Sequence, residues 1–120
     1  MNPFHLEALL LLAKQSGIKN VYIHFFTDGR DSYPKSAFSH LDDWERRAKR
    51  IGVGKIASLI GRFYAMDRAK NWERLKIAYN LLVNGEGEQF KNPKDAVVFA
   101  YDDNALTDEY IKPSVIIPKA

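Results

Sequence analysis

Cysteine is absent from this sequence, and several features that identify common classes of protein are absent with it. Without cysteine, the 120 residues hold no disulfide framework and no thiolate metal site, which suits a reducing compartment. An apolar run at residues 8–13 is too short to span a bilayer, and the first residues lack the basic leader and cleavage pattern of a signal peptide. We therefore expect a cytoplasmic protein without a membrane partner.

The signatures of several enzyme and nucleic-acid-binding classes are also missing. The sequence has no glycine-rich phosphate loop, no paired-histidine metal spacing and no serine in a nucleophile elbow. Its net charge of +3 is small, and the basic residues are interleaved with aspartate and glutamate. These absences argue against a nucleic-acid partner and give little sign of covalent chemistry by this chain alone.

The composition predicts one domain with an ordinary core. Apolar residues make up 46% of the chain and charged residues 28%, and the length suffices for one core but not for two. The leucine spacing predicts a helix over residues 3–16, with Gly17 after its end, and we expect this helix to be covered on more than one side. Residues 20–26 are β-branched and aromatic, which predicts a buried strand with His24 as a hydrogen-bonded core histidine.

A strand–helix–strand unit follows from the next segments. A loop at residues 27–35 leads to a helix that Ser36 can N-cap and that runs to about Arg50, and residues 55–60 form the next strand. A helix of this length between two strands favours parallel pairing with a right-handed crossover. Because parallel strands end at the same edge of a sheet, the loops at residues 27–35 and 61–67 should lie side by side at that edge.

Charge and apolar spacing predict which helix faces are exposed. In the helix up to Arg50, we expect a solvated charged face with ion pairs between Asp42 and Arg46 and between Asp43 and Arg47. Residues 71–83 predict a third helix, whose buried face is expected to consist of Trp72, Leu75, Tyr79 and Leu82.

The last segments complete an α/β fold with a mainly parallel or mixed sheet. Asn92 and Pro93 are typical of the start of a short helix, which should run to about Tyr101. The acidic residues 102–110 predict a loop with a short helical turn, and residues 114–117 predict a strand.

Arginine and aspartate concentrate in the two loops that parallel pairing brings together. Arg30 and Asp31 lie in the first loop, and Arg62 and Arg68 follow the second strand. The planar guanidinium group donates paired hydrogen bonds to carboxylate or phosphate and keeps its charge. Asp31 could accept hydrogen bonds from ligand hydroxyls or take a proton from one. The four residues predict one site for a small, multiply anionic ligand; the structural alternative is a local salt bridge within a turn.

Longer stretches of the sequence carry a family resemblance. Residues 21–31, 56–68 and 72–74, with residues 79–87 and 107–116, closely resemble the cofactor-independent (2,3-bisphosphoglycerate-independent) phosphoglycerate mutases. The resemblance covers essentially the whole chain, and the two arginine motifs are specific when they occur together in this order.

The resemblance implies a domain assignment. Members of that family have an α/β phosphatase-like domain with a serine nucleophile and two divalent metals, Mn²⁺ or Mg²⁺, and an inserted domain that grips the glycerate. The chain resembles most of the inserted domain, so residues 1–120 are expected to form a single, partial substrate-binding domain. It should bind no metal itself, should be inactive in isolation, and should have the phosphatase-like domain of the same enzyme as its partner.

The resemblance also implies roles for the candidate residues. Arg30 and Asp31 would contact phosphoglycerate, with Asp31 transferring protons to and from the glycerate hydroxyls, and Arg62 and Arg68 would bind the carboxylate and the phosphate. The implied isomerase reaction of glycolysis and gluconeogenesis interconverts 3-phosphoglycerate and 2-phosphoglycerate through a phosphoserine. The chain departs from the family at residues 69–71, Ala-Lys-Asn where Asp-Lys-Arg is common, which removes charge beside the site.

Two alternatives from other classes stay open on the sequence. The chain could be a stand-alone binding module for small phosphorylated metabolites, or a structural or interaction domain without a ligand. Binding of phosphoglycerate, and its loss on substitution of Arg62 and Arg68, separates these two alternatives.

Overall fold

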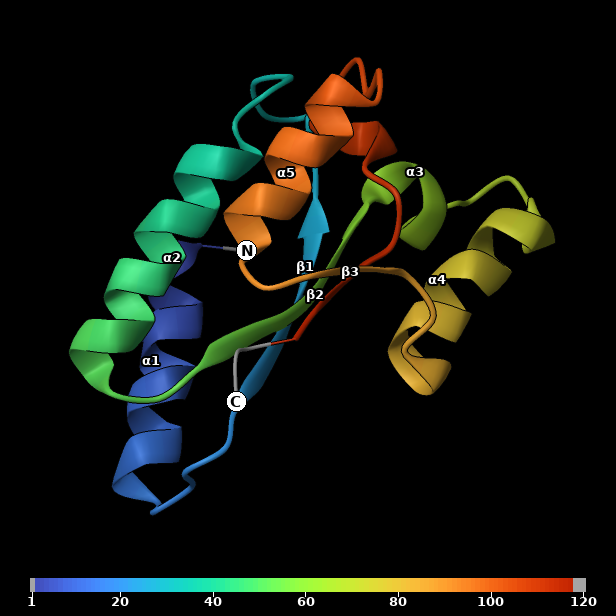
Figure 1. The fold of residues 1–120 in the computed structure, drawn as a ribbon. Helices are drawn as coiled ribbons and strands as arrows, with labels where there is room; N and C mark the ends of the chain where they lie inside the picture. The colour runs from blue at the N-terminus through green and yellow to red at the C-terminus, as the bar shows by residue number, and fades with distance from the viewer. Residues whose placement is uncertain (1, 118–120) are drawn as a thin grey trace.

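The structure is a computed structural model that describes residues 2–117. Its elements follow the order helix, strand, helix, strand and then a mixture of short and long pieces (Figure 1). In chain order they are α1 Pro3–Gln15, β1 Tyr22–Thr27, α2 Ala37–Ile51, β2 Lys55–Gly61, α3 Arg62–Ala65, α4 Trp72–Asn84, β3 Glu88–Phe90, α5 Pro93–Asp102, the 3₁₀ turn η1 Asp108–Tyr110, and β4 Ser114–Ile116.

One mixed sheet organises the fold, in the strand order β1-β2-β4-β3. β1 and β2 are parallel, β2 and β4 are antiparallel, and β3 and β4 are parallel. The predicted α/β class and the parallel crossover through α2 are therefore confirmed. In this register the last residues of the parallel strands, Thr27 and Gly61, are partners, so the loops that follow them start side by side.

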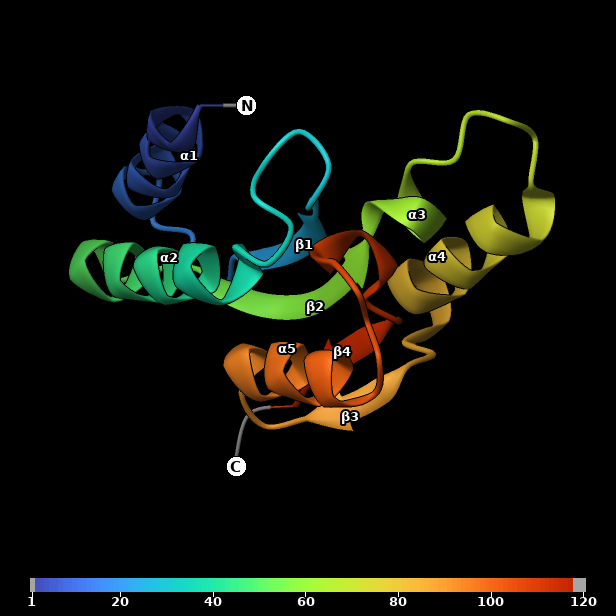
Figure 2. The ribbon, with the colours of Figure 1, turned by 90° about the horizontal axis from the view of Figure 1, so that it is seen from above.

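Helices cover both faces of the sheet. α2 and α5 pack on one face, where the central buried residues are Leu41, Leu59, Val97 and Ile111. α4 packs on the opposite face against Ile60, and α1 lies beside α2, on the side away from α5 (Figure 2). The sheet is therefore a middle layer whose carboxyl edge, at β1 and β2, remains available for a site.

The prediction that α1 is covered on more than one side is wrong. Leu10 is the one residue of this helix in the buried core, where it contacts Ala48 and Ile51. Leu9 and Leu12 are more than half exposed. The four consecutive leucines point around the whole helix, but α1 meets its neighbours only through the side that faces α2.

The prediction of a buried strand over residues 20–26 is only half right. Ile23 and Phe25 pack against the core, whereas Tyr22, His24 and Phe26 point to a face that no helix covers there and are exposed. His24 is hydrogen-bonded, with Nδ1 2.7 Å from Oγ of Ser58, but it is not a core residue. The alternation is that of a strand with one face in contact with the core.

The third helix is rotated from the predicted orientation. Ala78 and Leu81 form the buried side of α4, whereas Trp72 is 67% exposed and Tyr79 and Leu82 are also exposed. The apolar residues of this helix lie on several sides, so their spacing in the sequence was compatible with more than one choice of buried face. Two short elements, α3 and β3, were not predicted.

Local patterns in the sequence correctly predicted α5 and the ion pairs along α2. Asn92 caps α5, because its Oδ1 accepts a hydrogen bond of 2.9 Å from the N–H of Lys94, and Pro93 is the first residue of the helix. The ion pairs predicted along α2 are present at 3.0 Å for Asp42 with Arg46 and 2.8 Å for Asp43 with Arg47. Within residues 2–117, no helix is both long enough and apolar enough to cross a membrane.

Candidate functional site

The candidate site lies where β1 and β2 end. The loop after β1 and the helix α3 after β2 lie at the same end of the sheet, at the top of Figure 1. This is the carboxyl edge of the parallel pair, where α/β proteins place ligands. The predicted juxtaposition of the two loops is confirmed.

Asp28 folds the first loop into a turn. Its Oδ1 accepts hydrogen bonds of 3.2 Å from the backbone N–H groups of both Arg30 and Asp31. Gly29 has a φ of +73°, which glycine adopts without the strain that a side chain would bring. The turn leaves the side chains of Arg30 and Asp31 exposed, available to a ligand.

Arg62 connects the two loops. Its Nη1 donates hydrogen bonds of 2.6 Å to Oδ1 of Asp28 and 2.8 Å to Oδ2 of Asp31. These bonds to Asp31 and Asp28 raise the pKa of Arg62 above its ordinary value. Partial burial raises the pKa of Asp28, but the bonds from Arg62 and from the backbone outweigh it and hold that pKa below its usual value. These two bonds fix the guanidinium group. Because Nη1 makes both of them, the other terminal nitrogen, Nη2, is not used by the two aspartates.

A cavity of about 340 Å³ opens beside this ion pair. Arg30, Arg62 and Arg68 all line it, so the structure brings the three predicted arginines to one hollow. Asp31 does not line the cavity itself; it lies at the edge, where it holds Arg62. In the described part of the chain, Arg30 and Arg68 have no ion-pair partner, so their guanidinium groups can meet an anion.

A fourth arginine belongs to the same cavity and was missed from the sequence. The guanidinium carbon of Arg74 lies 3.8 Å from the centre of the Phe63 ring, and its Nη1 lies 3.7 Å from Oδ1 of Asp67. Arg74, Phe63 and Asp67 all line the cavity. Arg74 lies six positions after Arg68, and the signal that could have found it is the stretch of residues 72–74, which carries part of the family resemblance.

Asp67 stabilises the start of α4 next to the cavity. It accepts hydrogen bonds from Nδ2 and from the backbone N–H of Asn71, at 2.8 Å and 2.7 Å. These bonds, the side-chain one foremost, hold the pKa of Asp67 below its ordinary value. Asn71 immediately precedes α4, so Asp67 holds the turn that leads into this helix.

The third side of the site comes from η1. The short helical turn itself was predicted within residues 102–110, but its position at the site was not. Glu109 lines the cavity, and the backbone of η1 touches both glycines at the loop starts. A Cβ atom at Gly61 would lie 2.0 Å from the carbonyl oxygen of Glu109, and one at Gly29 would lie 3.0 Å from Asp108. Only glycine allows this close approach, so the two glycines serve the packing of η1 on the loops.

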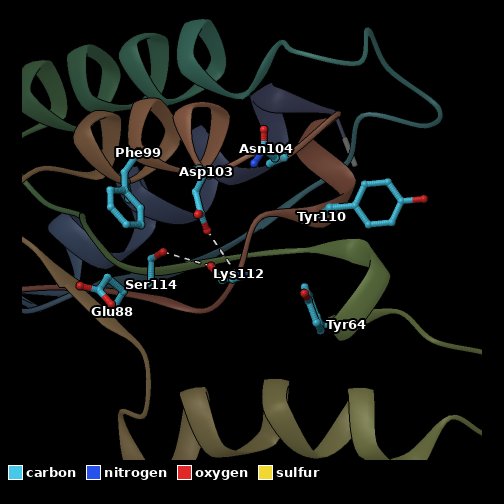
Figure 3. A pocket seen from close by; sticks show the side chains of 11 residues that line it. Tyr64, Glu88, Phe99, Asp103, Asn104, Tyr110, Lys112 and Ser114 are labelled. Atoms are coloured by element: carbon cyan, nitrogen blue, oxygen red, sulfur yellow. Dashed lines mark hydrogen bonds and ion pairs between the residues drawn. The ribbon is translucent and has the colours of Figure 1, made fainter.

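A second cavity, of about 320 Å³, lies between α3, α5 and β3 (Figure 3). Tyr64, Phe99 and Tyr110 give it an aromatic lining, and Lys112 pairs with Asp103 at 3.2 Å on its wall. Its single lysine is already paired, and it contains no arginine. It therefore offers much less to a multiply charged anion than the arginine cavity.

The described residues do not fit a metal centre. Among residues 2–117, no three or more histidine, aspartate or glutamate side chains come together in a group that could hold a metal ion. The carboxylates of Asp28, Asp31 and Asp67 are instead bonded to Arg62, Arg74 and nearby N–H groups.

Comparison with known proteins shows the family of the chain. Residues 2–120 match the model of the family described as the BPG-independent PGAM N-terminus. The chain belongs to this family. It is 54% identical over 112 residues to the 2,3-bisphosphoglycerate-independent phosphoglycerate mutase of Clostridium kluyveri, and 48% identical over 120 residues to that of Clostridium botulinum strain ATCC 19397.

The matched region is a small part of these mutases. The alignment covers 93% of the chain but 22% of the Clostridium kluyveri protein, and 97% of the chain but 23% of the Clostridium botulinum protein. A crystal structure of Leishmania mexicana phosphoglycerate mutase at low cobalt concentration superimposes with a TM-score of 0.86 at 27% identity, over 95% of the chain and 22% of that structure. The chain therefore has the fold of one segment of a BPG-independent mutase.

Proposed function

We propose that the chain is the substrate-gripping part of a phosphoglycerate mutase that interconverts 3-phosphoglycerate and 2-phosphoglycerate through a phosphoserine. The observation that carries the proposal is the convergence of Arg30, Arg62 and Arg68 on one cavity, with Asp31 bonded to Arg62 at its edge. The name of the relatives supports the proposal, as does the chemistry of arginine, which binds carboxylate and phosphate.

Each arginine has a distinct part in the proposed grip. Arg62 is fixed by Asp28 and Asp31, so it offers a positioned charge to the ligand without further ordering. Arg30 precedes Arg62 in the sequence and Arg68 follows it, and both side chains are exposed. A guanidinium fork suits both the carboxylate and the phosphate of phosphoglycerate. We assign these two groups to Arg62 and Arg68, and assign contact with the substrate to Arg30.

Asp31 is the candidate for proton transfer. Its side chain is 77% exposed, and one oxygen faces Arg62, which leaves the other oxygen available to a glycerate hydroxyl. In the proposed reaction Asp31 moves protons to and from the glycerate hydroxyls while the arginines hold the glycerate in place.

The rest of the reaction belongs to a partner domain. The proposed phosphatase-like domain of the same enzyme would supply the serine nucleophile and two divalent metals, Mn²⁺ or Mg²⁺. No step is assigned to a metal in this chain, because its described residues offer no group of ligands for one. We also propose residues 1–120 as one partial domain of this enzyme, in the cytoplasm, where the glycolytic substrate is found.

Calorimetry with 3-phosphoglycerate tests the grip. The wild-type chain should release heat on binding, and the double variant Arg62→Ala/Arg68→Ala should not. Arg46→Ala is the matched control, because Arg46 is a solvated arginine of α2 that pairs only locally with Asp42. Absence of binding by the wild-type chain would contradict the proposal.

A coupled enolase assay with Mn²⁺ tests the assignment to one part of the enzyme. The pure chain should show no turnover, because the proposed nucleophile and metals lie outside it. Turnover by the pure chain would show that it performs the chemistry unaided, against the proposed division of labour.

A further inference from the structure

Asp108 is a buried carboxylate that the proposed substrate contacts do not use. Its Oδ2 accepts hydrogen bonds from the backbone N–H groups of Ser36 at 2.7 Å and Ala37 at 2.8 Å, and its Oδ1 accepts one from the hydroxyl of Tyr101. Ser36, which the sequence indicated as the cap of α2, makes no side-chain capping bond. Asp108 therefore caps α2 from a position 72 residues further along the chain.

The backbone of Asp108 holds the same loop at its start and near its end. Thr27, the last residue of β1, donates a hydrogen bond of 2.6 Å from Oγ1 to the carbonyl oxygen of Asp108. The N–H of Asp108 donates one of 2.7 Å to the carbonyl oxygen of Pro34. The loop that carries Arg30 and Asp31 is thus anchored on one residue, before and after the arginine.

The second arginine loop is anchored on the next residues. Gly61 packs directly on the carbonyl of Glu109, and its N–H donates a hydrogen bond of 2.7 Å to the carbonyl oxygen of Ile111. α3, which starts with Arg62, follows Gly61 immediately. η1 and the residue after it therefore contact both loops at the end of the sheet (Figure 1).

We propose that Asp108 is a positioning residue, which holds Arg30 and Asp31 in register with Arg62 so that the cavity is formed before an anion arrives. A loop ordered in advance loses less conformational freedom on binding, which raises affinity without any contact to the ligand. The proposal deepens the proposed function and rests on it for the identity of the anion. The hydrogen bonds of Asp108 to Thr27, Pro34, Ser36, Ala37 and Tyr101, which we call the clamp, are a property of the free chain.

The variants separate this role from general stabilisation. Asp108→Ala removes every side-chain bond of the clamp. Asp108→Asn keeps the shape: its amide oxygen can accept the two N–H bonds, and its amide nitrogen can donate to the oxygen of Tyr101. Asp103→Ala is the control, because Asp103 is an exposed carboxylate five positions earlier that pairs with an exposed lysine.

Two measurements are made at a temperature where each variant is folded: amide hydrogen exchange and calorimetry with 3-phosphoglycerate. In Asp108→Ala the amides of Arg30, Asp31, Ser36 and Ala37 should exchange about 10-fold faster, while those of α4 should keep their protection. Affinity for 3-phosphoglycerate should fall by about 10-fold. Asp108→Asn should recover most of both losses, and Asp103→Ala should match the wild type.

Unchanged loop exchange in a folded Asp108→Ala would overturn the proposal, and so would faster exchange that extends equally through α4. If Asp108→Ala does not fold, Tyr101→Phe and Thr27→Val each remove one contact and should each speed loop exchange by about 3- to 10-fold. No change in either would also overturn it. Hydrogen exchange needs no ligand. If the wild-type chain fails to bind 3-phosphoglycerate, the proposed function is contradicted, but the exchange measurement still tests the role of Asp108.

Discussion

Arg62 donates a hydrogen bond of 2.8 Å to Asp31, although 31 residues of chain separate the two. The same Nη1 atom also bonds to Asp28, which shapes the turn that presents Arg30. The contact exists because β1 and β2 are parallel and end at the same edge of the sheet. The ion pair therefore links the fold to the site, and the predictions below depend on it or on the residues around it.

Arg62→Lys should weaken binding of 3-phosphoglycerate by about 10-fold. Lysine keeps the charge, but two bonds to the aspartates leave only one of its three N–H donors for an anion, whereas Arg62 bonds to both through Nη1 and keeps Nε and Nη2 as a fork. Titration calorimetry measures the effect, and Arg46→Lys on the exposed side of α2 is the control. Equal affinity in Arg62→Lys would mean that only charge, not fork geometry, is used.

Asp31→Asn should leave binding intact or strengthen it by about 2- to 3-fold. The substitution removes a negative charge from the edge of the anion site and loosens one of the two bonds on Arg62. A role in proton transfer predicts this separation of binding from chemistry. A 10-fold loss of affinity in the same titration would instead make Asp31 an essential binding group.

Gly61→Ala should destabilise the chain strongly, by about 3 kcal/mol or more. The added Cβ would lie 2.0 Å from the carbonyl oxygen of Glu109, and the contact is between backbone atoms that cannot rotate away. Urea unfolding gives the difference. Gly85→Ala is the comparison: its φ is +67° but nothing lies within 4 Å, so it should cost only about 1–2 kcal/mol for the left-handed backbone. Similar losses in both variants would contradict the packing argument.

Asp67→Asn should lower stability at neutral pH, and the difference from the wild type should shrink in acid. The pKa of Asp67 in the fold is below its ordinary value of 3.8, so its contribution is present above that value. It is lost as the pH falls through the folded pKa, because the protonated carboxyl resembles the amide. Urea unfolding of both proteins at neutral and at acidic pH checks this. A difference that grew on acidification would show that the carboxylate does not stabilise the fold.

Local patterns in the sequence were enough to predict the strand–helix–strand unit. The length of α2 between two β-branched segments allowed little besides a parallel crossover, and that crossover placed Arg30, Arg62 and Arg68 at one edge. The start of α5 at Asn92 and Pro93 could also be predicted, because a helix cap bonds to residues within a few positions of itself.

Only the tertiary structure decided how those pieces are held. Asp108 reaches Thr27, Ser36 and Ala37 across 71 to 81 positions, and the sequence around it gives no sign of which backbone groups will lack a partner. The orientation of α4 and the exposure of α1 likewise depend on which neighbours are present, since their apolar residues lie on several sides. The sequence by itself determined that Arg30, Arg62 and Arg68 gather at one sheet edge, because the direction of the strands follows from short-range spacing. The tertiary structure decided how the two loops are held and which further residues join them, because those depend on long-range contacts with η1.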